Sequence, residues 1–162
     1  MLVADLDPTY TLTKLFCKKF ATKIDNHPML PDWDNYFHPN NGIKTIRDAL
    51  DPVIEDAPIP LTSASVITVV DDTHVDEGIT GCVKLIAGSP IIDDYTDKVS
   101  FAFGSSGSQC KNAPGALQRV LDLTAEEHEI DFVLLDLGGS TSALNKVALM
   151  GSDYFLVPCA VS

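Results

Sequence analysis

The chain has 162 residues, 45% of them hydrophobic, and a mean hydropathy of +0.12, which exclude global disorder and predict one domain spanning residues 1–162. Its 23 acidic and 11 basic residues give a net charge of −12, so charge repulsion disfavours direct DNA binding by this segment. The longest apolar runs fall far short of the ~20 residues of a membrane span, and the scattered cysteines are typical of reduced thiols. We therefore expect a cytoplasmic protein with no membrane span.

The first part of the chain is predicted to alternate strands and helices. Leu2–Ala4 has the composition of a buried strand, and residues 10–24 then switch to helical periodicity, with apolar side chains along one stripe. Residues 25–42 are rich in Asn, Asp and Pro and are expected to form an irregular loop. A short helix is predicted over residues 43–53, and Val66–Val70 is predicted to be the next strand.

The middle of the chain continues this alternation. Cys82–Ala87 is predicted to be a strand, and it ends in Gly88-Ser89-Pro90. Residues 99–104, "VSFAFG", are expected to form another short strand or an extended connection. Pro114 suits the first turn of a following helix, where the missing N–H would have no intrahelical partner in any case.

The clearest unit is "IDFVLLDLGGSTSALNKVALMGSDYFLVPCAVS" at the end of the sequence. Phe132–Leu135 is an apolar strand closed by Asp136, and Ser140 or Thr141 is expected to cap the helix that follows. Tyr154–Val157 is predicted to be the next strand. Strand, helix and strand at this spacing predict a right-handed crossover, and hence an α/β fold with a mainly parallel, doubly wound sheet.

Two aspartates follow the first strand, in "MLVADLDPTYTLT", and this pattern is typical of proteins that handle a phosphate with magnesium. Asp5-Leu6-Asp7-Pro8-Thr9 resembles the opening motif of haloacid-dehalogenase-type phosphatases. In that class Asp5 would be the nucleophile and Asp7 would protonate the leaving group. That class also needs a second pair of acidic residues, nearer the C-terminus, to bind magnesium. In this sequence the strand at Phe132–Leu135 is followed by Asp136 alone.

A second resemblance covers more of the chain. "VADLDPTYTLT", "GIKTIRDALDPVI", "VKLIAGSP" and "DFVLLDLGGSTSALNKVALMGSDYFLVPCAVS" are similar, in the same order, to four segments of the ParA/MinD-type partition ATPases. Pro8 and Thr13 fall where the pattern of that family places them, and the last segment resembles its Walker B strand with the helix and strand that follow. We therefore prefer this family, whose fold is a P-loop NTPase-like doubly wound sheet.

This resemblance implies a role for each candidate site residue. Asp136 would orient a water on Mg²⁺, Asp7 would position or polarise the water that attacks the γ-phosphate of ATP, and Asp5 would lie behind the direct ligands of the metal. Pro158 and Cys159 would lie against the adenine. We expect Asp5, Asp7 and Asp136 to meet at the carboxyl-end edge of one parallel sheet.

The family also implies a biological role, namely ATP hydrolysis that drives plasmid or chromosome partitioning or intracellular positioning. The partners would be a second copy in an ATP-bound homodimer and a ParB-like or adaptor protein. The sequence departs from the family at Thr9, where Gln is usual, and at Gly138-Gly139, where Pro-Pro is common. It also lacks a Lys-Gly-Gly-x-Gly-Lys-Thr loop, so we expect an incomplete domain that does not hydrolyse ATP by itself. A third hypothesis is a non-catalytic interaction module on the same fold.

Overall fold

The computed structural model describes residues 1–21, 44–72, 81–104 and 110–159. The loop predicted at residues 25–42 therefore lies outside the described residues, as does Ile43 at the start of the predicted short helix. In chain order the elements are β1 (Leu2–Asp5), α1 (Thr11–Ala21), α3 (Ile46–Ile54), β2 (Ile67–Asp72), β3 (Gly81–Ile86), α4 (Asp93–Gly104), α5 (Ala113–Glu127), β4 (Val133–Asp136) and α6 (Ala143–Gly151).

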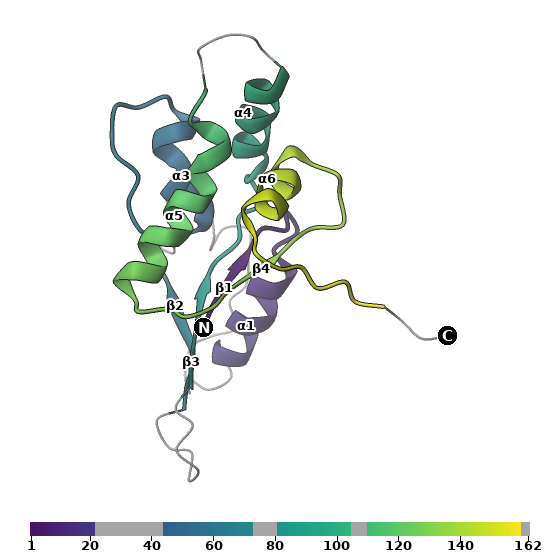
Figure 1. Cartoon of the computed structure of the whole chain (residues 1–162). Helices are drawn as coiled ribbons and strands as arrows, with labels where there is room; N and C mark the ends of the chain where they lie inside the picture. The colour runs from purple at the N-terminus through teal and green to yellow at the C-terminus, as the bar shows by residue number, and fades with distance from the viewer. Residues whose placement is uncertain (22–43, 73–80, 105–109, 160–162) are drawn as a thin grey trace.

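The four strands form one sheet in the order β2-β3-β1-β4 (Figure 1). The central strand β1 is parallel to both of its neighbours, with Ala4 opposite Ile86 of β3 and Leu135 of β4. Only β2 runs antiparallel, at one edge beside β3. This topology confirms the predicted α/β fold with a mostly parallel sheet.

The side chains of β1 alternate between two covered faces of the sheet, as expected for a buried strand. Leu2 and Ala4 belong to the hydrophobic core that α3, α4, α5 and α6 build on one face. Asp5 points to the other face, where its carboxylate contacts Thr13 of α1. Helices therefore pack on both sides of the strand that carries the first candidate site residues.

Helices α5 and α6 follow from local sequence signals. Pro114 lies in the first turn of α5, as predicted, and the buried side chains of that helix recur at helical spacing from Ala113 to Thr124. The cap of α6 is Ser142, whose side chain accepts a hydrogen bond from the Asn145 N–H, so the predicted caps Ser140 and Thr141 were wrong by one or two residues. Within the described ranges, no helix is both long and apolar enough to cross a bilayer.

Two segments differ from the prediction: residues 99–104, expected to be a short strand or an extended connection, and Tyr154–Val157, expected to be a strand. Residues 99–104 form the end of α4, because Tyr95 and Val99 lie one helical turn apart and are both fully buried. Tyr154–Val157 has strand-like composition but is paired with no strand, and its side chains are 69–90% exposed. A strand needs a neighbour for its backbone hydrogen bonds, and the described sheet supplies none to this segment.

Candidate functional site

Three carboxylates lie at the carboxyl-end edge of the sheet, and we call Asp5, Asp7 and Asp136 the aspartate cluster. Asp5 ends β1 and is directly opposite Asp136 at the end of β4, and the Leu6 N–H donates to the Asp136 carbonyl at 2.8 Å. Burial raises the pKa of Asp136, and the negative charge of Asp7 raises it further. The predicted meeting of these aspartates at one edge of a parallel sheet is confirmed.

Asp5 is fully buried, and its carboxylate is held by groups of the chain itself. Its Oδ2 accepts hydrogen bonds from the Thr13 N–H and the Thr13 hydroxyl, both at 2.7 Å, and its Oδ1 accepts one from the Asp7 N–H at 3.2 Å. Burial raises the pKa of Asp5 because it disfavours the charged form, whereas the bonds from Thr13 and Asp7 act in the opposite direction. Since Thr13 lies in the first turn of α1, Asp5 fixes the start of that helix against the sheet.

Gly88, just after β3, completes this arrangement. Its N–H donates to the Thr13 hydroxyl oxygen at 2.9 Å, so the Thr13 hydroxyl both donates to Asp5 and accepts from Gly88. A Cβ at position 88 would lie 3.0 Å from the Asp5 Cγ, the Asp5 carbonyl oxygen and the Tyr10 Cβ. A side chain at position 88 would therefore force the Asp5 and Tyr10 atoms to shift by a few tenths of an ångström. Sequence reasoning assigned it no role, although a small residue that ends a parallel strand was the available signal.

Asp7 and Asp136 are partly exposed, unlike Asp5. The Asp7 Oδ1 accepts a hydrogen bond from the Thr9 N–H at 2.8 Å, which turns the chain tightly after β1. The backbone of Gly138 packs beside the same carboxylate, since a Cβ there would lie 3.3 Å from the Asp7 Oδ1. Gly138 thus lies against Asp7, the candidate catalytic residue.

The aspartate cluster fits magnesium better than a metal held entirely by protein ligands. Among the described residues, no three His, Cys, Asp or Glu side chains are placed to hold a metal ion together. Magnesium keeps several waters and commonly needs one or two carboxylates besides phosphate oxygens. Asp136 and Asp7 can provide these, whereas the buried Asp5 can orient its neighbours but faces no solvent.

The loop between β4 and α6 is fixed by Asn145, which sequence reasoning missed. Asn145 is 7% exposed, and its side-chain amide donates to the carbonyls of Gly138 and Ser140, each at 2.7 Å. These bonds fold the loop back over the start of α6 and keep Gly138 beside Asp7. An Asn among the apolar positions of a helix was the only local signal for this role.

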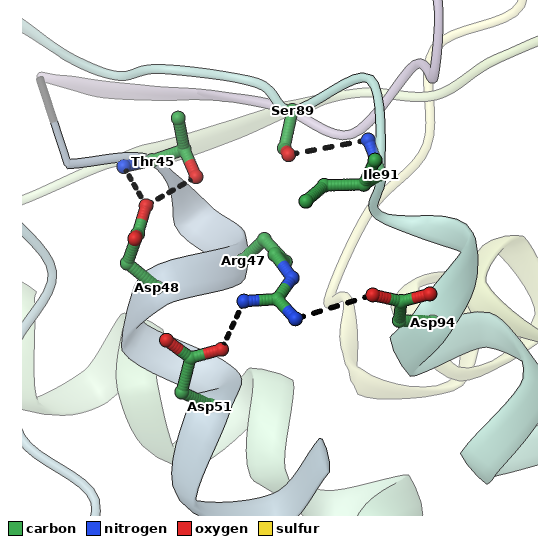
Figure 2. A network of polar contacts seen from close by, with 7 residues as sticks. All are labelled: Thr45, Arg47, Asp48, Asp51, Ser89, Ile91 and Asp94. Atoms are coloured by element: carbon green, nitrogen blue, oxygen red, sulfur yellow. Dashed lines mark hydrogen bonds and ion pairs between the residues drawn. The ribbon is translucent and has the colours of Figure 1, made fainter. Parts of the chain in front are cut away.

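A polar network beside the residues that follow β3 contains Arg47 of α3 (Figure 2). Arg47 binds Asp51 one turn further along α3 and Asp94 of α4, the latter at 3.2 Å. The Ile46 N–H donates to the Ala87 carbonyl at 2.8 Å, which attaches α3 to the sheet edge. Because two carboxylates neutralise its guanidinium, Arg47 serves to join α3 to α4 and provides no free positive charge for a phosphate.

The structure does not place Pro158 and Cys159 with the aspartate cluster. Both residues are exposed in the segment that leaves α6 and extends away from the sheet (Figure 1). The Cys159 thiol contacts the Val157 carbonyl of the same segment, at 3.6 Å. Their expected contact with adenine therefore remains a prediction.

Comparison of the chain with known proteins found no relative. No family model matches the sequence, and neither a curated protein nor a solved structure matches it.

Proposed function

We propose that this chain carries the magnesium and water-positioning part of a ParA/MinD-like ATPase. Such a protein would act in the cytoplasm, would dimerise around ATP, and would use hydrolysis with a ParB-like or adaptor partner to partition DNA or position cargo. The observation that carries the proposal is the aspartate cluster at the ends of two neighbouring parallel strands, where open α/β sheets bind their ligands. The order of the four resembling segments along the sequence supports it independently.

Each aspartate would have a different task because each has a different environment. Asp7 is partly exposed and fixed by the Thr9 N–H, so it could hold and polarise a water molecule. Asp136 would orient a water on Mg²⁺, which supplies charge neutralisation for the phosphates when bound. Asp5 would hold Asp7 and the start of α1 in place through the bonds described above. Pro158 and Cys159 would contact the adenine once their segment is packed against the nucleotide.

The dehalogenase-type phosphatase is the weaker candidate. Its motif makes Asp5 the nucleophile, which must approach phosphorus directly. Asp5 is instead fully buried, and both of its oxygens accept hydrogen bonds from the chain. A non-catalytic module on the same fold would leave the aspartate cluster without a ligand. Burial raises the pKa of both Asp5 and Asp136, and the charge of a neighbouring aspartate raises each further, so a cation would favour the charged forms.

The experiment that tests the proposal measures ATP binding and hydrolysis with Mg²⁺ in the natural gene product that contains these residues. Wild-type protein should hydrolyse ATP, and Asp7→Ala should bind ATP and dimerise but lose hydrolysis by at least ~100-fold, as expected when a water-positioning group is removed. The matched control is Asp97→Ala, which removes an exposed aspartate of α4 and should leave hydrolysis unchanged.

The 162-residue chain without a Gly-Lys-Thr loop should bind ATP weakly or not at all. It should also show no turnover of p-nitrophenyl phosphate. Magnesium-dependent p-nitrophenyl phosphate turnover that disappears in Asp5→Asn would favour the phosphatase. Absence of nucleotide binding in the natural gene product would instead favour the non-catalytic module.

A further inference from the structure

Helices α3 and α5 lie side by side (Figure 1), and a groove outside the aspartate cluster runs between the end of α3, the connection over residues 57–61 and the start of α5. Its volume is about 920 Å³, which is within the size range of ligand sites. Val53, Leu61 and Ala116 give it apolar walls, and Ile59 beside them is 62% exposed. All of these residues belong to internal segments of the chain, away from both termini in Figure 1.

The charges that line this groove favour an anionic occupant. Lys111 and Arg119 are both exposed on its α5 side, and neither side chain is paired with another described residue. Asp56 is the acidic residue among those that line the groove, and its charge is already paired with Lys98. In a chain with a net charge of −12, two unpaired cations on one wall are a local excess of positive charge.

Gly115 lies on the same wall between the two cations, and nothing in the described fold requires a glycine there. A Cβ at this position would meet no atom within 4 Å. Glycine makes a helix less stable than alanine does, but it allows another molecule to approach the backbone closely. Lys111 comes four positions before Gly115 and Arg119 four positions after it, and all three line the groove. The wall is therefore a bare section of backbone between two positive charges.

We infer that this groove binds an extended segment of a partner protein that carries two acidic residues four positions apart. Four residues of an extended chain span ~13 Å, which matches the ~12 Å that eight residues span along a helix. Alternate residues of such a segment face the same side, so its two acidic residues face Lys111 and Arg119 and the residue midway faces Gly115. The residues in between are apolar and pack against Val53 and Leu61. The groove contains no member of the aspartate cluster, and the inference does not rest on the proposed function.

The first test measures peptide binding by fluorescence anisotropy in the natural gene product that contains these residues. The probe is a labelled Glu-Leu-Ala-Leu-Glu peptide, which has the inferred spacing and should bind saturably with a Kd below ~1 mM. The uncharged peptide Gln-Leu-Ala-Leu-Gln should bind at least ~5-fold more weakly, and added salt should weaken only the acidic peptide. Equal binding of the two peptides, or no saturable binding of the acidic one, would overturn the inference.

Charge variants locate the binding on the protein. Arg119→Gln removes one cation of the groove and should weaken the acidic peptide about 2–5-fold, as expected for an exposed charge pair. Lys146→Gln is the matched control, because it removes an exposed cation of α6 that does not line the groove. It lowers the net charge equally and should leave the affinity unchanged. The same loss in both variants would mean general electrostatic attraction and would contradict a bound site.

Variants of Gly115 separate a binding role from a structural one. Gly115→Ala should raise the melting temperature by ~1–3 °C, because the new methyl group meets nothing and the helix gains stability. Gly115→Gln places a longer side chain in the groove and should weaken the acidic peptide by at least ~10-fold without unfolding the protein. Gly104→Ala changes a glycine of α4 that also has open space around it, and peptide binding should not change. A destabilised Gly115→Ala protein, or full peptide affinity in Gly115→Gln, would refute the assignment.

Two further measurements identify the kind of occupant. Inorganic phosphate at the concentration of the peptide should not displace it, since phosphate makes no apolar contacts; displacement would mean a site for small anions. Light scattering without nucleotide should give the same mass for wild-type protein and Gly115→Gln. A wild-type dimer that Gly115→Gln converts to a monomer would show that a second copy fills the groove, and would overturn the inference of a separate partner.

Discussion

Replacement of Thr13 by valine tests the central polar contact of the candidate site. The Thr13 hydroxyl donates to the buried Asp5 carboxylate at 2.7 Å and accepts from the Gly88 N–H at 2.9 Å. Valine has nearly the same shape but can do neither. Thr13 is fully buried, so water cannot easily replace the lost partner.

The substitution should lower the free energy of unfolding for two reasons: Asp5 loses a hydrogen-bond donor, and the Gly88 N–H loses its acceptor. A hydrogen bond to a charged group contributes about 1.5–3 kcal/mol, and a buried N–H without a partner costs about 1–3 kcal/mol. Thr13→Val should therefore lower the free energy of unfolding by about 3–5 kcal/mol, a large share of the ~5–15 kcal/mol typical of a domain.

Thr124→Val is a matched control. The Thr124 hydroxyl is also fully buried, donates to the Val120 carbonyl at 2.7 Å and accepts from the Ala64 N–H at 2.8 Å. Both of its partners are uncharged, so this variant should lose about 2–3 kcal/mol. The difference of roughly 1–2 kcal/mol between the two variants measures the bond to the Asp5 carboxylate.

The two variants should also differ in pH dependence. The pKa of Asp5 is raised in the folded protein, so the native state binds more protons than the unfolded state between the usual pKa and the raised one. Stability therefore falls as the pH rises through that window, and Thr13→Val should steepen the fall because the Thr13 hydrogen bonds lower this pKa.

Urea denaturation followed by circular dichroism, repeated from mildly acidic to neutral pH, measures both effects. The extra cost of Thr13→Val over Thr124→Val should shrink as the pH falls and Asp5 becomes protonated in both states. Equal costs for the two variants at every pH would refute the view that the Thr13 hydroxyl stabilises a buried carboxylate.

Two further substitutions test the packing around the aspartate cluster. Gly88→Ala should cost about 1–3 kcal/mol of unfolding free energy, because the new methyl group meets Asp5 and Tyr10 atoms at 3.0 Å; Gly139→Ala, where a Cβ meets nothing within 4 Å, is the control. Asn145→Ala should cost about 2–3 kcal/mol by removing two bonds to carbonyls of the β4–α6 loop, and hydrogen exchange should show faster opening of that loop. A stable Gly88→Ala protein or an unchanged loop in Asn145→Ala would contradict these contacts.

The sequence by itself determined most of the local elements and the edge at which the aspartates meet. The apolar strands ending in Asp5 and Asp136 predicted parallel pairing, because strands that alternate with helices join by right-handed crossovers that align their carboxyl ends. The helical spacing of Ile46 and Leu50 predicted α3, and Pro114 marked the start of α5. Each of these signals lies within a few residues of the feature that it predicts.

Only the tertiary structure decided which polar groups contact one another. Asp5 contacts Thr13, and Thr13 contacts Gly88 across 75 positions of sequence, which no local periodicity can encode. The same limit explains Tyr154–Val157: its composition satisfies every local requirement of a strand, yet a strand forms only where a neighbouring backbone supplies hydrogen bonds. Composition sets the propensity of a segment, whereas pairing depends on which other segment the fold brings to its side.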